Sequence, residues 1–106
     1  FNNLEAVVNF LKNKDKVTVI MAGDKPNKVL EDQGCAQVLK DELEGKTYDW
    51  PQLQSKISRF IRDYYAWPEQ EEIDSLAVVF AKSTYNIIPV GSINKEGFVQ
   101  VKSLKL

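Results

Sequence analysis

The chain has 106 residues, of which 43% are hydrophobic and 27% charged, a composition typical of one globular domain. Fourteen Lys and Arg residues nearly balance fifteen Asp and Glu, so a net charge of −1 gives no overall attraction to nucleic acid or anionic membrane. Residues 17–22, apolar apart from Thr18, and the apolar run 76–81 are both too short to cross a bilayer. Because Cys35 is the only cysteine, no intramolecular disulfide can form. We expect a soluble, cytoplasmic protein with no membrane contact.

The first half of the chain predicts two helical regions separated by a strand. Apolar residues at helical spacing predict a helix over residues 4–13. Residues 16–23 are β-branched and apolar without alternation, which is typical of a strand covered on both faces, so we expect it at the centre of the sheet. Residues 26–44 are either one helix or two pieces, because Gly34 interrupts them at a cost of about 1 kcal/mol. Gly45 is a plausible stop after this region.

Two further helices follow. Asp49 and Pro51 are a capping carboxylate and a first-turn proline, which together mark the start of a strongly amphipathic helix. Residues 68–82 begin with proline and a cluster of acidic residues, which favours another helix. Within it, residues 77–81 are apolar nearly all round, so we expect this stretch to be well buried.

The C-terminal segment predicts a β-hairpin. Residues 85–90 and 98–104 are rich in β-branched and aromatic residues, and a turn signal with Gly97 lies between them. Pro89 places its strand at an edge or near a strand start. We therefore predict an α+β fold in one compact domain, residues 1–106, with a small sheet made of the central strand plus the C-terminal hairpin, packed with three or four helices.

The side chains that usually carry catalysis are scarce. The chain has no histidine, so the most frequent general base near neutral pH is missing, and one cysteine cannot form a zinc site. The acidic clusters do not follow the spacing of an EF-hand. We expect no cofactor, no metal and no catalytic residue. One enzymatic alternative uses Asp24 or nearby carboxylates with a lysine such as Lys25 or Lys28, directly after the predicted strand, where α/β folds often bind ligands.

A concentration of aromatic residues around the third helix supports a binding role. Trp50 and Trp67 bracket this helix, and Tyr65 lies at the margin of its apolar arc. Such side chains act as interface anchors, although they also pack as lids over a core. Our main hypothesis is a non-enzymatic protein–protein interaction module that binds a protein partner through Trp50, Tyr65 and Trp67, or through the exposed face of the C-terminal hairpin, whose edge can pair with a partner strand.

Two other functions stay open. Lys56, Arg59 and Arg62 form a basic stripe on the polar arc of the third helix, and such a stripe can follow the phosphates of nucleic acid. The alternative is therefore a nucleic-acid-binding domain, although a solvated helix face is the more frequent meaning of such a pattern. Because the sequence begins with Phe1, the chain can also be one domain of a larger protein whose activity lies elsewhere.

Overall fold

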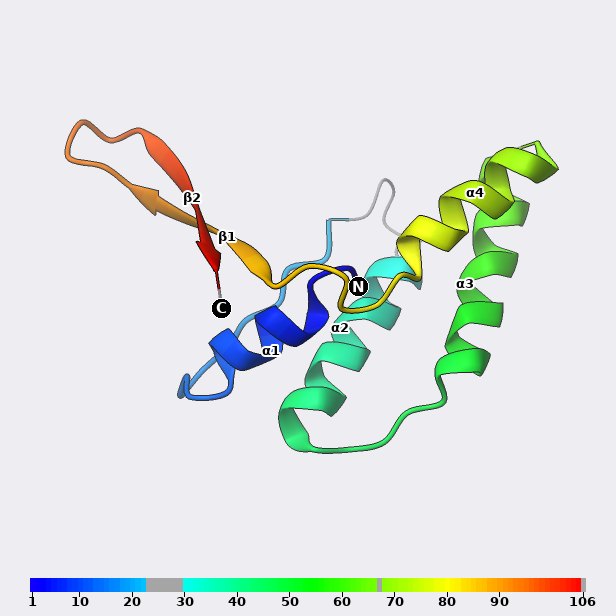
Figure 1. Ribbon diagram of the computed structural model, residues 1–106, viewed down its shortest axis with the longest axis horizontal. Coiled ribbons are helices and arrows are strands. Elements are labelled where there is room, and N and C mark those ends of the chain that lie inside the picture. The colour runs from blue at the N-terminus through cyan, green and yellow to red at the C-terminus, as the bar shows by residue number, and fades with distance from the viewer. Residues whose placement is uncertain (23–29, 67, 106) are drawn as a thin grey trace.

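A computed structural model describes residues 1–22, 30–66 and 68–105. Figure 1 shows its helices at one end of the molecule and a β-hairpin that projects at the other. The elements in chain order are α1 (Leu4–Leu11), α2 (Leu30–Glu44), α3 (Trp50–Tyr65), α4 (Glu69–Val79), β1 (Ile87–Ile93) and β2 (Val99–Lys105). The predicted α+β class is confirmed, and the predicted helices and hairpin lie close to their expected positions.

Helix α3 begins where its local sequence predicts. The Asp49 carboxylate accepts a hydrogen bond from the Gln52 backbone N–H at 3.0 Å, which satisfies one of the free donors of the first turn. Ala66 ends the helix in the left-handed conformation, with φ of 50°. Ile57 and Ile61 on the inner face are buried, Ile57 completely. The amphipathic pattern therefore sets which face of α3 packs into the core.

Helix α2 is continuous through Gly34, and Gly34 is where α2 meets α3. A Cβ atom added to Gly34 would lie 2.9 Å from Leu53 Cδ1 and 3.2 Å from Ile57 Cδ1. The glycine therefore permits a closer approach of the two helices than any other residue would, which offsets its poor helix propensity. Gly45, with φ of 68°, follows the last turn of α2, as predicted.

The hairpin is an antiparallel pair in which Ile87 lies opposite Lys105 and Ile93 opposite Val99. Its turn is held by Asn94, whose Oδ1 accepts hydrogen bonds from backbone N–H groups at 2.9 and 3.0 Å, and Gly97 adopts a φ of 85°. Pro89 lies in a sheet of only two strands among the described residues, so it stands at an edge. The predicted hairpin is confirmed.

The predicted central strand is not formed within the described residues. Of residues 16–23, the structure describes 16–22, which pair with no described strand and are exposed; the side chain of Ile20 is 86% accessible. Val17, Val19 and Met21 lie along α2, which covers one side of the segment. The apolar run predicted a strand covered on both faces. Among the described residues, only α2 lies against this segment, on one face.

The predicted burial of residues 77–81 is also wrong. Val78 and Val79 of α4 are 66% and 38% exposed. Helix α4 lies at the outer edge of the molecule beside α3 (Figure 1), so one face of α4 has a neighbour and the opposite face meets solvent. An apolar run indicates burial only where a second element covers the far side of the helix.

The described core is small for a chain of this size. The hydrophobic residues that are nearly inaccessible are Leu4, Ala6, Val38, Ile57, Ile61 and Ile88. The chain exposes 7969 Å², whereas a folded protein of this mass exposes about 6000 Å². Its radius of gyration is 15.6 Å, against about 13 Å for a compact domain. The organisation of residues 1–106 as one compact domain stays a prediction. No described helix is long and apolar enough to span a membrane.

Candidate functional site

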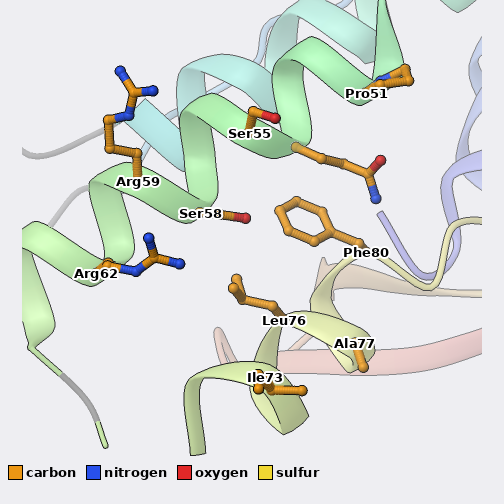
Figure 2. Close-up of a pocket in the computed structure, with 10 residues that line it drawn as sticks. Pro51, Ser55, Ser58, Arg59, Arg62, Ile73, Leu76, Ala77 and Phe80 are labelled. Atoms are coloured by element: carbon orange, nitrogen blue, oxygen red, sulfur yellow. The ribbon is translucent and has the colours of Figure 1, made fainter. Parts of the chain in front are cut away.

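An open groove of about 880 Å³ lies between α3 and α4. Figure 2 shows the side chains that line it: one wall comes from α3 and the other from α4 and the residue that follows it. The lining residues are Pro51, Gln54, Ser55, Ser58, Arg59, Arg62, Ile73, Leu76, Ala77 and Phe80. The groove is therefore polar on one side and apolar on the other, an arrangement that suits a small ligand with a charged group.

The α3 wall is polar because of helical periodicity. Ser55, Ser58, Arg59 and Arg62 fall at i, i+3, i+4 and i+7, which places them on one face of the helix. This lining contains two guanidinium groups and no carboxylate. In Figure 2, Ser58 and Arg62 point toward the α4 side chains, whereas Arg59 extends away from Leu76 and Phe80. The wall therefore offers an anion two positive charges and two hydroxyl groups.

Arg62 also links the two helices. Its Nε donates to both carboxylate oxygens of Glu72, at 3.1 and 3.4 Å. Glu72 is only 6% exposed, so little water surrounds its carboxylate. A carboxylate buried in this way needs a charged hydrogen-bond partner, which Arg62 provides. The contact ties α3 to α4 at one end of the groove and partly offsets the charge of Arg62. Arg59 forms no ion pair with another described residue, so it provides the stronger attraction for an anion.

The α4 wall is apolar. Leu76 and Phe80 face the hydroxyl-bearing side of α3 in Figure 2, and Ile73 stands 54% exposed beside them. A ligand bound against Ser58 would therefore contact hydrocarbon on its opposite side. Apolar cover of this kind lowers the local dielectric for a ligand at Ser58, whereas the Arg59 guanidinium lies on the side away from this cover.

Trp50, predicted to bind a partner, is part of a half-buried aromatic cluster. Its ring lies 4.9 Å from that of Phe1 and 5.9 Å from that of Phe80, both edge to face. The Lys82 ammonium lies 5.0 Å from the same ring. These contacts join the chain start, α3 and the end of α4. The position matches the lid over a core that the sequence left as the other explanation of this residue.

The other two predicted partner-binding residues do not join Trp50 in one described patch. Tyr65 is 39% exposed and ends α3, which is 16 residues long, so it lies about 22 Å from Trp50 along the axis. Trp67 lies outside the described residues, as do Asp24, Lys25 and Lys28 of the enzymatic alternative.

The predicted basic stripe is partly drawn into the groove. Arg59 and Arg62 line it, whereas Lys56 is exposed and does not. Sequence reasoning placed Ser55 and Ser58 on the same polar arc but gave them no role. What it missed was the α4 wall, because no local signal in residues 69–79 indicates which helix they face. Among residues 1–22, 30–66 and 68–105, no three His, Cys, Asp or Glu side chains come together as metal ligands.

Comparison with known proteins finds a relative that is named as a phosphatase. The chain is similar to a probable 2-phosphosulfolactate phosphatase from Pseudothermotoga lettingae, with 32% identity over 102 residues. The match covers 85% of this chain and 46% of the relative, so the chain spans about half the relative's length. No protein family matches the chain, and no solved structure does.

This similarity overturns the hypothesis of a non-enzymatic interaction module, because the relative is named as an enzyme. The error has a chemical cause. The hypothesis treated missing histidine and a lone cysteine as evidence against catalysis. Phosphoryl transfer depends mainly on positioning and on electrostatic stabilisation of charge, which arginine and hydroxyl groups can provide. A chain without imidazole is therefore not excluded from this chemistry.

Proposed function

We propose that this chain takes part in the hydrolysis of a phosphate monoester of a small anionic acid, of the type named for its relative. The similarity to a probable 2-phosphosulfolactate phosphatase, 32% identical across 85% of the chain, is the observation that carries the proposal. The chain spans about half of that relative, so the relative's full activity and its substrate belong to the proposal.

The groove between α3 and α4 suits such a substrate by charge. A 2-phosphosulfolactate ion carries a phosphate, a sulfonate and a carboxylate, all negative near neutral pH. A guanidinium group can donate two parallel hydrogen bonds to one such group. We assign this role to Arg59, with the Ser58 hydroxyl as a further donor. Arg62 contributes less attraction because Glu72 already holds its Nε.

The reaction itself is a substitution at phosphorus. The oxygen of a water molecule bonds to phosphorus as the bond between phosphorus and the ester oxygen breaks. A proton from that water passes to the departing oxygen, and the products are inorganic phosphate and the 2-hydroxy acid. Positive groups near the phosphoryl oxygens stabilise the charge of the transition state. The α3 wall would act in this way, and the apolar α4 wall would limit competing solvent.

The test measures binding of 2-phosphosulfolactate by calorimetry and release of inorganic phosphate, with Mg²⁺ and with a chelator. Arg59→Ala should weaken binding about 10- to 100-fold, the range for loss of a charge-assisted hydrogen bond. Lys56→Ala is the matched control, since Lys56 is exposed on the same helix outside the groove. Absence of both binding and phosphate release in every condition would refute the proposal. Equal loss in the two variants would refute the role of the groove.

A further inference from the structure

Residues 17–22 have the side-chain arrangement of a β-strand without the partners of one. Val17, Val19 and Met21, every second residue, line a groove of about 550 Å³ against α2. On the α2 side the groove is formed by Gln33, Ala36, Gln37, Lys40, Leu43 and Glu44. Alternation with a period of two is the geometry of an extended chain, with one face directed at the helix.

The other side chains of residues 17–22 are exposed, and the backbone groups of this segment have no described hydrogen-bond partner. Thr18 is exposed and Ile20 is 86% accessible. No backbone N–H or C=O of residues 16–22 forms a hydrogen bond with another described residue. A run of β-branched residues with bare backbone groups is what an unpaired sheet strand presents to solvent.

We propose that residues 17–22 form a β-strand that pairs, through its main chain, with strands of polypeptide equivalent to the part of the phosphatase relative that this chain does not match. The inference rests on the proposed function, because the relative defines the occupant. More than half of the relative lies outside the match. In this arrangement α2 covers one face of the strand and Ile20 lies on the other face.

The exposed area of the chain supports an interface of this size. The chain exposes 7969 Å², which exceeds the expectation for its mass by about 2000 Å². A stable interface needs only about 800 Å² from each partner. The described sheet has two strands, and an isolated hairpin is marginally stable in water. Added strands would therefore complete a sheet that the described residues leave short.

A second copy of this chain fits the segment less well than an added strand. Two-fold pairing of residues 17–22 with their own copy would use one edge of the strand and leave the other edge bare. The backbone groups of these residues lack described partners throughout. The largely apolar sequence of residues 17–22, with Ile20 opposite the α2 side, is typical of an inner strand of a sheet that is covered on both faces.

The experiment co-expresses the full 106-residue chain with a polypeptide that comprises the unmatched part of the relative. Co-purification and hydrogen exchange are measured, and the amides of residues 18–21 should exchange at least about 100-fold more slowly in the complex than in the chain alone. Val19→Pro removes a backbone donor, whereas Val19→Ala keeps the donor and shortens the side chain. We expect Val19→Pro to bind about tenfold more weakly than Val19→Ala. Circular dichroism should show that both variants keep the helices.

The inference would be overturned by no complex, by a complex in which residues 18–21 stay unprotected, or by equal binding of the two variants. Protection of the same amides in a dimer of the chain alone would also overturn it, in favour of self-pairing. None of these readouts uses a substrate. A complex with a protected strand that neither binds nor hydrolyses 2-phosphosulfolactate would refute the proposed function and leave the strand pairing intact.

Discussion

Replacement of Gly34 by alanine is a sensitive test of how α2 and α3 pack. The new Cβ atom would lie 2.9 Å from Leu53 Cδ1, where carbon atoms normally stay about 3.5 to 4.0 Å apart. It would also lie 3.2 Å from Ile57 Cδ1. Leu53 is half-buried and its end can rotate, but Ile57 is completely buried and cannot move without disturbing the core.

Two opposing effects set the outcome. Alanine improves helix propensity by about 1 kcal/mol relative to glycine. Overpacking of a close helix contact costs about 1 to 3 kcal/mol. We therefore expect Gly34→Ala to lower the free energy of unfolding by about 1 kcal/mol, measured by urea denaturation followed by circular dichroism. The melting temperature should fall by about 4 to 8 °C per kcal/mol lost.

A matched pair of variants isolates the propensity effect. Gln33 is exposed in the same turn of α2, so Gln33→Ala should be more stable than Gln33→Gly by about 1 kcal/mol. Adding Leu53→Ala should relieve the clash at Gly34 and give a favourable coupling of at least about 0.5 kcal/mol. If Gly34→Ala stabilises the protein as much as alanine does at position 33, the close approach of the helices is refuted.

Three further perturbations test the site and its supports. In a double-mutant cycle, Arg62→Met and Glu72→Gln should show a coupling of about 1 to 2 kcal/mol in urea denaturation, since Glu72 is buried and Arg62 largely exposed. Asp49→Ala should cost about 1 kcal/mol in the same assay, because the Gln52 N–H loses its cap. Burial and a hydrogen bond to Glu42 raise the pKa of Tyr48, so the folded state holds this proton more tightly, and melting temperatures should fall as pH rises above about 10.

Each of these has its own control. Additive effects of Arg62→Met and Glu72→Gln would mean that the ion pair does not join α3 to α4. Asp49→Asn keeps an acceptor at the cap and should lose far less stability than alanine. Tyr48→Phe removes the phenol, so it should flatten the alkaline part of the stability profile. An unchanged profile in Tyr48→Phe would assign the alkaline loss to other groups.

The candidate site was only half predictable. The polar arc of α3, with Arg59 and Arg62 on it, follows from helical periodicity and was visible in the sequence. The apolar wall could not be predicted from the sequence. Leu76 and Phe80 have the pattern of core residues, and this pattern does not indicate which element they face. For Trp50 the sequence left two explanations, an interface anchor and a lid over the core, and its edge-to-face contacts with Phe1 and Phe80 place it in a half-buried aromatic cluster.

The sequence by itself determined the elements whose signals are local. The cap at Asp49, the turn at Asn94 and Gly97 and the 3.6-residue period of α3 satisfy backbone groups and apolar faces within a few positions. The tertiary structure alone decided which faces meet. Val78 is solvent-exposed and residues 17–22 lack a described strand partner because burial requires a second surface, and local sequence does not encode whether a distant segment supplies it.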